Sequence, residues 1–378
     1  MTQTLDVKAI FSEAEFQRLK ALAGKPLRQG EQFNELASTD VIRHFAHGYG
    51  DTNPLFTDRE YARRTRWGGI IAPPTFLFSC AGHITATIGF PGAHALWAED
   101  RWTWNLPVHE GDVIKSEVFS LDCRRIYQKF ADPMYAQEGK RVFKNQRGEV
   151  VAEEARTTFR FVRQTSDKKV EERNRYKGIE AWTYTEEDIA KIYAEYDQEV
   201  LRGSTSRYFE DVAVGEVIPQ IVKGPLTVTD FVAWKIGLGF APFTRAHKIR
   251  ADFERRHPTT AIKNKYGIPD APERVHWEED LARENGIPLP FDFGHQRITW
   301  LAQVATNWMG DDGFLRNLKV RIRKPNMVTD TSWCRGKVVA KELEGDKGVV
   351  RCEVWSENQR GWVTATGEAV VVLPRRRT

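Results

Sequence analysis

The stretch that decides the fold is PDAPERVHWEEDLARENGIPLPFDFGHQRITWLAQVATNWMGDDG, residues 269–313. Within it, apolar residues recur at steps of three and four, at positions Ile298, Leu301, Ala302, Ala305, Trp308 and Met309. This period predicts a buried helix that begins near residues 291–294. Asp270 and His276 lie before it, in a turn-rich segment with two prolines. The first turn of a helix has free N–H donors, so a carboxylate and an imidazole aimed at it can form an acid/base site.

The composition describes an ordinary soluble protein with room for a sizeable core. The chain has 378 residues, which favours two domains or one large one. Its 56 basic and 52 acidic residues give a net charge of +4, too balanced to predict a nucleic-acid partner. The four cysteines lack the spacing of metal ligands. Charged residues at Asp6, Lys8 and Glu13 interrupt any early apolar run, so we expect a cytoplasmic protein.

One segment imitates a membrane span. Residues 67–98 contain no Asp, Glu, Lys or Arg. The segment also holds three prolines and two histidines, at Pro73, Pro74, Pro91, His83 and His94. Such residues favour a buried helix with flanking loops over a transmembrane helix. We therefore expect a helix core at residues 76–88 and no membrane span.

The chain contains one unit twice. Four short patterns recur in the same order: residues 39–42 and 229–232, 56–62 and 276–282, 107–112 and 325–330, and 145–148 and 358–361. Their offsets are 190, 220, 218 and 213 residues. These offsets are nearly constant except for one jump of 30, which places an insertion between Phe243 and Glu273. The shared order indicates a duplicated unit.

Each unit reads as helices followed by strands, which predicts an α+β fold with a helix packed on an antiparallel sheet. Residues 164–205 are rich in charge and poor in apolar residues, which is typical of a linker that carries one amphipathic helix. We therefore divide the chain into a first half at residues 1–163, a charged linker at 164–205 and a second half at 206–378.

The first half contains GDTNPLFTD at residues 50–58, with Ala62 after it. This stretch resembles the hydratase motif of the MaoC-like, (R)-specific enoyl-CoA hydratases, Gly-Asp-x-Asn-Pro-Ile-His-x-Asp. The first half also looks like the dehydratase regions of fatty-acid synthases. The resemblance implies a double hot-dog fold, in which curved antiparallel sheets wrap long central helices and join into one layer. It also implies that an Asp and a His add water to, or remove it from, an acyl-CoA without metal or another cofactor.

The two halves match this motif unequally. In the first half Asp51 and Asn53 agree with it, but Phe56 stands at the histidine position. We therefore expect the first half to shape the pocket for the coenzyme A arm, with Asp51 and Asn53 as possible pocket residues. In the second half His276 falls on the histidine position, and Asp270 lies one residue from the aspartate position. The resemblance thus predicts Asp270 and His276 as the catalytic pair, and it leaves Asp51 of the first half as the alternative source of the acid.

The chemistry of hydration explains the choice of these side chains. Adding water to an unsaturated thioester requires a base for the water, an acid for the α-carbon and donors for the enolate-like oxygen. We expect Asp270 to orient and deprotonate the water and His276 to share the proton transfer. Backbone N–H groups near Gly294 and His295 are expected to hold the thioester oxygen.

Two other functions stay open on the sequence. A hot-dog thioesterase uses an acid at the central helix, and Asp292 precedes that helix. A non-catalytic acyl-CoA-binding protein agrees with the phenylalanine at position 56. For all three functions we expect an acyl-CoA ligand and a homodimer. The insertion carries seven basic residues that can meet phosphates or form a solvated loop: Arg245, Lys248, Arg250, Arg255, Arg256, Lys263 and Lys265.

Overall fold

The computed structural model describes residues 7–28, 30–82, 88–128, 131–162, 176–239 and 244–376. Residues 83–87 of the expected first central helix and residues 163–175 of the expected linker lie outside these ranges. Among the described residues, no helix is both long enough and apolar enough to cross a membrane.

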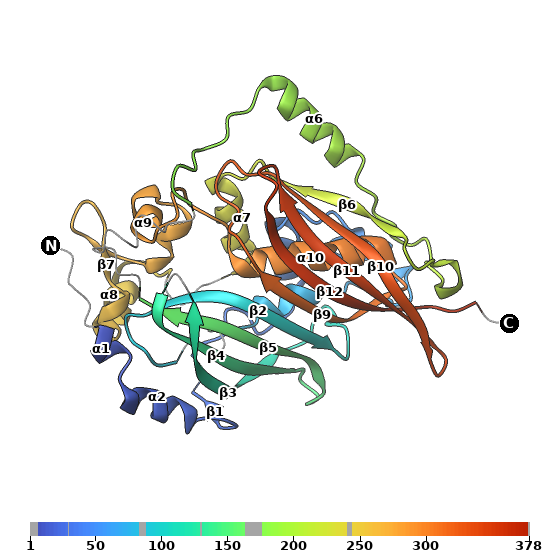
Figure 1. Ribbon diagram of the computed structural model, residues 1–378. Coiled ribbons are helices and arrows are strands. Elements are labelled where there is room, and N and C mark those ends of the chain that lie inside the picture. Colours follow the sequence, from blue (N-terminus) through green and yellow to red (C-terminus); the bar gives the residue numbers. More distant parts are fainter. Residues whose placement is uncertain are drawn as a thin grey trace.

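One antiparallel sheet of ten strands runs through the described part of both halves, in the order β1-β3-β4-β5-β2-β9-β12-β11-β10-β6 (Figure 1). The first half supplies β1 (Pro26–Leu27), β2 (His94–Trp104), β3 (Lys115–Gln128), β4 (Ala131–Lys144) and β5 (Val150–Phe161). The second half supplies β6 (Val217–Lys223), β9 (Phe314–Ile322), β10 (Ser332–Glu344), β11 (Lys347–Asn358) and β12 (Val363–Leu373). The halves join where β2 pairs with β9, from Glu99–Arg321 to Thr103–Asn317. The expected continuous double hot-dog sheet is confirmed.

The remaining elements lie around this sheet. The α-helices are α1 (Val7–Ile10), α2 (Glu13–Lys20), α3 (Thr39–Gly48), α4 (Arg59–Arg63), α6 (Glu186–Asp197), α7 (Val228–Leu238), α8 (His247–Arg256), α9 (Glu279–Glu284) and α10 (Gly294–Met309). The short 3₁₀ helices are η1 (Pro54–Phe56), η2 (Pro74–Phe78), η3 (Phe209–Asp211), η4 (Pro258–Thr260) and η5 (Pro272–His276). A separate hairpin pairs β7 (Ile262–Lys263) with β8 (Pro269–Asp270).

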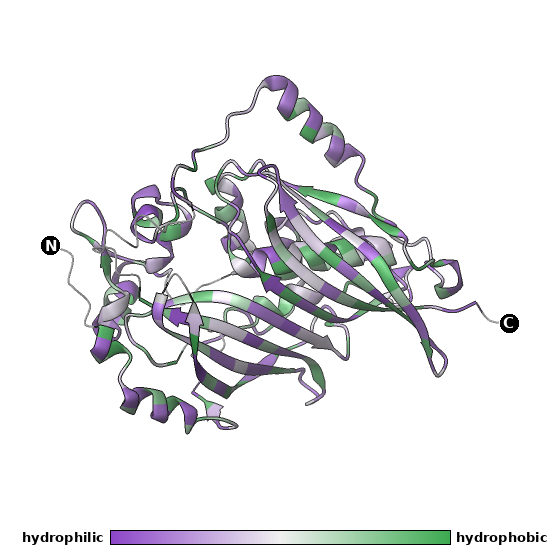
Figure 2. Cartoon of the chain, in the orientation of Figure 1, coloured by the Kyte–Doolittle hydropathy of each residue, from purple (hydrophilic) through white to green (hydrophobic). Residues whose placement is uncertain are grey.

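The helix α10 is the core of the second half, as its period predicts. Every side chain from Gln296 to Met309 is buried, and the helix packs on β6, β9, β10, β11 and β12. No glycine or proline interrupts it after its first residue, and Gly310, at φ 68°, ends it. Strand residues alternate between hydrophilic and hydrophobic (Figure 2), so each strand turns one face toward the core and one toward solvent.

The corresponding helix of the first half departs from its prediction. The described part of residues 76–88 forms the 3₁₀ helix η2 and then turns, instead of an α-helix. The carbonyl of Ser79 accepts a hydrogen bond from the backbone N–H of Asn34 at 2.9 Å, so a distant segment takes a group that an α-helix would use. A Cβ on Gly82 would lie 2.1 Å from the Glu31 carbonyl oxygen, because the same segment crosses there.

The duplication is visible in matching hydrogen bonds. Asp112 accepts a hydrogen bond from the Gln146 Nε2 at 2.9 Å, and Asp330 accepts one from the Gln359 Nε2 at 2.9 Å. Each carboxylate also accepts from the backbone N–H three residues before it. These bonds tie the loop before β3 or β10 to the turn after β4 or β11, so the repeated sequences build repeated loops.

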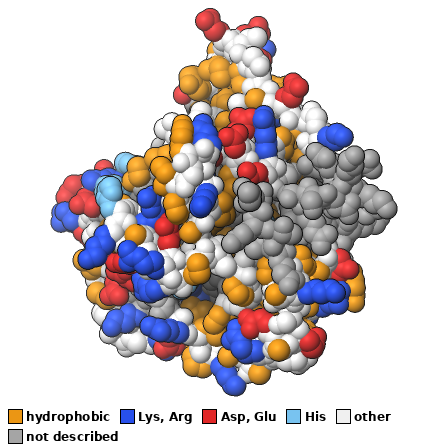
Figure 3. All heavy atoms as spheres, turned by 90° about the vertical axis from the view of Figure 1, so that its left-hand side faces the viewer, with side chains coloured by type: hydrophobic (Ala, Val, Ile, Leu, Met, Phe, Trp, Pro, Cys, Tyr) orange, Lys and Arg blue, Asp and Glu red, His pale blue; other side chains and the backbone are white. Residues whose placement is uncertain are grey.

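The predicted insertion makes one connection of the second half longer than its counterpart in the first half. Residues 49–53 connect α3 to η1, whereas residues 239–271 connect α7 to η5. The described part of the longer connection contains α8, η4 and the β7–β8 hairpin. Several of its basic side chains are paired with acids, as in Arg255–Asp252 at 2.5 Å. Basic and acidic side chains are accordingly interspersed on this side of the molecule (Figure 3).

Candidate active site

The second-half site is built on His276, the last residue of η5. Its Nδ1 lies 2.7 Å from the carbonyl oxygen of Phe291. Because a carbonyl only accepts, Nδ1 carries the proton and Nε2 keeps its lone pair. The ring packs on Phe293 with 3.8 Å between centroids. Burial lowers the pKa of His276 to about 3, so the imidazole is neutral at physiological pH and Nε2 can accept a proton.

The start of α10 faces this imidazole with unused donors. Phe293 supplies no side-chain cap to the helix. Within the described parts of the chain, the backbone N–H groups of Gly294 and His295 have no acceptor. Both groups belong to the first turn, where the helix dipole also favours negative charge. This turn can therefore receive an oxygen on which negative charge develops.

His295 completes the aromatic lining of the site. Its ring stacks on Trp97 at 5.0 Å and meets Trp234 edge to face at 5.1 Å. Its buried Nδ1 has no hydrogen-bond partner among the described residues. Burial lowers the pKa of His295 well below its usual value, so this ring is also neutral.

The first half contributes to the second-half site through Trp97 of β2. The indole lies over the Arg156 guanidinium at 3.4 Å and donates from Nε1 to Asp100 at 3.1 Å. Asp100 and Arg156 are buried and paired at 3.1 Å. A Cβ on Gly294 would lie 2.9 Å from the Trp97 Cβ. Only glycine therefore allows the helix start to approach the indole this closely.

Asp270 does not lie beside His276 as the motif suggests. The β7–β8 hairpin places Asp270 opposite Ile262. Its carboxylate accepts from the Ala271 N–H at 2.7 Å and pairs with the Arg274 Nε at 3.6 Å. The described residues show no contact between Asp270 and His276. The two predicted catalytic side chains are thus on one loop but are not brought together.

Asp292, the acid required by the thioesterase interpretation, is held by hydrogen bonds and an ion pair. Its buried carboxylate accepts from the Asn326 backbone N–H at 3.1 Å and side-chain Nδ2 at 3.0 Å, and it pairs with the Arg297 Nε at 2.7 Å. Burial raises its pKa to about 6. Through these contacts Asp292 links the start of α10 to the loop before β10.

Sequence reasoning missed a buried ion pair beside the histidines. Lys235 of α7 places Nζ 3.2 Å from the Glu273 Oε2, and both side chains are mostly enclosed. The same Nζ lies 5.4 Å from the centre of the Phe293 ring, on which His276 packs. Burial lowers the pKa of Lys235. The sequence signal that could have indicated Glu273 is its position three residues before His276, which places both residues within one turn.

Asp51 and Asn53 lie at the opposite end of α10. The Asp51 carboxylate is buried and accepts from the Tyr49 hydroxyl at 2.8 Å and the Asn53 N–H at 2.9 Å. Burial raises its pKa. Asn53 caps η1 through the Leu55 N–H at 2.9 Å and donates from Nδ2 to Asp311 at 3.3 Å. These two residues build the first-half loop, and Asn53 reaches the pocket beside it.

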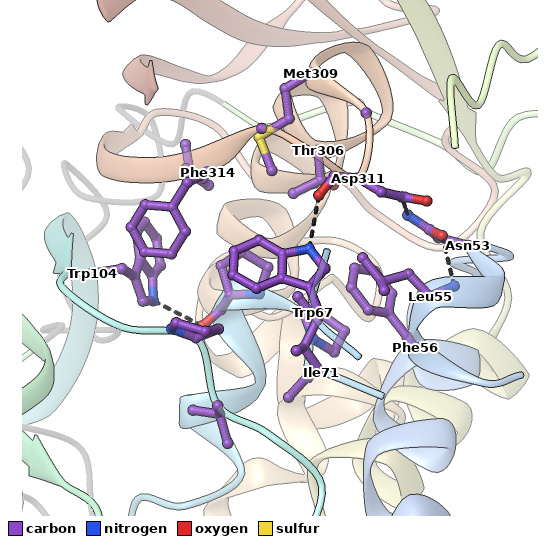
Figure 4. Close-up of a pocket in the computed structure, with 18 of the residues that line it drawn as sticks. Asn53, Leu55, Phe56, Trp67, Ile71, Trp104, Thr306, Met309, Asp311 and Phe314 are labelled. Carbon is purple, nitrogen blue, oxygen red and sulfur yellow. Dashed lines mark hydrogen bonds between the residues drawn. The ribbon is translucent and has the colours of Figure 1, made fainter. Parts of the chain in front are cut away.

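That first-half pocket is an apolar slot of about 550 Å³, counted with its open mouth (Figure 4). Phe56 and Leu55 form one side, and Met309 and Phe314 lie across from them. Its one buried acid, Asp311, accepts from the Tyr61 hydroxyl at 2.6 Å, and the backbone oxygen of this residue accepts from Trp67 Nε1 at 2.7 Å. Sequence reasoning did not foresee this acid, which follows the helix-ending Gly310.

The two sites are too far apart to share one reaction. The sixteen residues of α10 separate Gly294 from the loop that holds Asp311, and a rise of 1.5 Å per residue gives about 24 Å. No group of three His, Cys, Asp or Glu residues able to hold a metal ion occurs at either site or elsewhere in the described ranges.

Comparisons with known proteins agree with the fold. Residues 26–154 match the family described as FAS1-like, dehydratase domain region. Over 95% of its length the chain superimposes on all of a solved MaoC-like dehydratase, with a TM-score of 0.63 and 17% identity. The expected resemblance to the MaoC-like proteins is confirmed. A Mycobacterium tuberculosis protein described as a double hotdog fold also superimposes on this chain. The TM-score is 0.54 and the identity 11%, over 92% of this chain and 96% of that one.

Curated relatives resemble part of the chain. A UPF0336 protein of Streptomyces avermitilis is 34% identical over 79 residues, which are 19% of this chain and 53% of the relative. A 3-hydroxybutyryl-CoA dehydratase of Methylorubrum extorquens is 34% identical over 86 residues, 22% of this chain and 52% of that enzyme. The chain therefore spans about half the length of the curated relatives it matches.

Proposed function

We propose that the chain reversibly adds water to an α,β-unsaturated acyl-CoA and forms the 3-hydroxyacyl-CoA at the second-half site. The observation that carries this proposal is the hydrogen bond from the His276 Nδ1–H to the Phe291 carbonyl. It leaves Nε2 as a base beside the uncapped start of α10. The similarity to dehydratases supports a lyase in general terms.

The proposed reaction uses the imidazole of His276 and the backbone N–H groups at the start of α10. As the water oxygen bonds to C3, one water proton moves to the His276 Nε2. The π electrons shift toward C2 and the thioester oxygen, which accepts from the N–H groups of Gly294 and His295. The proton then passes from Nε2 to C2, which restores the neutral imidazole. The product has gained one water, and the thioester bond is intact.

The low proton affinity of His276 agrees with a role in which Nε2 first takes a proton from water and then gives it to C2. An imidazole whose pKa is about 3 gives its proton back readily, so it does not trap the proton after the first step. The rings of Phe291 and Phe293, which pack on the imidazole, limit water around the base. Asp270 has no part in this step, because its carboxylate is paired with Arg274.

Product analysis of a set of trans-2-enoyl-CoA thioesters tests the function. Hydration lowers the enoyl absorbance and adds the mass of one water, with no release of free thiol. Thiol release at a comparable rate would establish a thioesterase instead, and binding without any turnover would establish a non-catalytic acyl-CoA-binding protein. The expected homodimer stays a prediction, which light scattering after gel filtration measures.

A further inference from the structure

The second-half loop lacks an acid at the family's aspartate position, where Ala271 stands. Two residues later it carries Glu273, which takes the place that Asn53 holds in the first half. Glu273 and His276 both belong to the 3₁₀ helix η5. Side chains three residues apart eclipse each other in a 3₁₀ helix, so these two project from the same side of the turn.

The contacts of Glu273 leave one oxygen available. Lys235 Nζ at 3.2 Å and the Thr244 hydroxyl both bind Oε2. In the described residues Oε1 has no hydrogen-bond partner. The glutamate side chain is 17% exposed, so a water or a substrate can still reach it.

Lys235 lies between this carboxylate and the ring on which the histidine packs. Its Nζ lies 5.4 Å from the Phe293 ring centre, and the His276 ring packs on that ring at 3.8 Å. The ammonium opposes formation of an imidazolium at His276, as the lowered pKa of this histidine reflects after burial, its main cause. An ionised Glu273 offsets that charge, since opposite charges attract strongly in a partly buried site.

We propose that Glu273 supplies the missing carboxylate of the second-half site and that Lys235 positions it. This inference rests on the proposed hydration. Glu273 Oε1 accepts the water hydrogen that stays on oxygen, while the other hydrogen moves to His276 Nε2 and then to C2. The carboxylate thereby orients the water and stabilises the transient imidazolium, and it is unchanged at the end of the cycle.

The test compares variants of the full chain with one trans-2-enoyl-CoA. Glu273→Gln is expected to lower kcat by about a hundredfold, the scale of a lost positioned acid/base group. Glu279→Gln removes a similar carboxylate from an exposed pair with Arg283 and serves as the matched control. Asp270→Asn is expected to change kcat by less than about threefold, because Asp270 does not contact His276.

The double variant Lys235→Met/Glu273→Gln separates positioning from structural support. Removing both partners leaves no unpaired buried charge, so thermal stability is expected to recover relative to Lys235→Met alone. kcat is expected to stay at the Glu273→Gln level. Recovery of kcat together with stability would overturn the inference, and so would a silent Glu273→Gln in a chain whose His276→Phe variant is inactive. A wild-type chain that hydrates no enoyl thioester would overturn the proposed function as well.

Discussion

The two ends of α10 carry the same loop from two copies of one unit, and they differ in chemistry. At the first-half end, Phe56 faces an apolar slot, and Asp51 is enclosed by bonds within its own loop. At the second-half end, the His276 Nε2 and the first N–H groups of α10 have no hydrogen-bond partner among the residues that the structure describes. Both copies of the unit thus place their motif residue beside α10, a phenylalanine in the first half and an imidazole in the second.

Away from the motif loops, the two halves share the same hydrogen bonds in the loops before β3 and β10. Asp112 with Gln146, and Asp330 with Gln359, make the same bond at the same distance. The difference lies in the loop that follows α3 or α7, where the second half has inserted α8 and the β7–β8 hairpin. The insertion leads directly into Ala271 and Glu273, so it changed the spacing before the motif and not the sheet below it.

The largest effect on stability is expected from Asp292→Ala. The substitution leaves Arg297 buried without its carboxylate partner and removes both bonds to Asn326. Breaking a buried pair in this way costs about 3–5 kcal/mol. Chemical denaturation measures the loss. If stability were unchanged while thioester turnover disappeared, Asp292 would be a reacting group and the two ends of α10 would need a new comparison.

The next effect concerns acid stability. A folded-state pKa of about 3 for His276, below its ordinary 6.5, means that the unfolded chain binds the proton first. Stability is therefore complete above pH 6.5 and falls toward pH 3, by at most about 1.4 kcal/mol per pH unit for this group. Denaturation of wild type and His276→Phe at pH 7, 5.5 and 4.5 measures the slopes. Equal slopes would show that His276 binds its proton equally well in the folded and the unfolded chain, which would contradict the lowered pKa.

A smaller effect is expected where the halves meet through α3 and α7. A Cβ on Gly237 would lie 2.6 Å from the His44 carbonyl oxygen and 2.9 Å from the Gly48 Cα. Gly237→Ala is expected to destabilise by about 1–2 kcal/mol, because the overlap exceeds the helix preference of alanine. Gly69→Ala, with nothing within 4 Å of the added Cβ, is the control. A melting temperature that rises in Gly237→Ala would argue against this close packing.

The smallest effect is expected from Asp51→Asn. An asparagine keeps one acceptor oxygen for the Asn53 N–H, and its amide NH2 can donate to the Tyr49 hydroxyl oxygen, so stability changes by no more than about 1 kcal/mol. Hydration at the second-half site is expected to stay within about twofold of wild type, since the Asp51 carboxylate bonds to Tyr49 and Asn53 of its own loop. A loss comparable to that of Glu273→Gln would mean that the first-half loop takes part in the reaction.

The sequence predicted features that depend on local pattern. The apolar period located α10. The four repeated patterns located the duplication, and the jump in their offsets from 190 to 220 located the insertion. The first central helix was predicted wrongly over residues 76–82, because Asn34 takes the Ser79 carbonyl from a distant segment. The pairing of Asp270 with Arg274, and of Lys235 with Glu273, depends on how the insertion folds back. Motif alignment contains no information about that path.

The central claim, that hydration occurs at one end of α10 only, is tested most directly by exchanging the residues at the two motif positions. The measurement is the initial rate of trans-2-enoyl-CoA hydration for His276→Phe and Phe56→His, with folding checked by thermal melts. We predict that His276→Phe falls by at least about a hundredfold, and that Phe56→His stays within about twofold of wild type. Wild-type rates in His276→Phe, or recovery of activity when Phe56→His is added to it, would contradict the account.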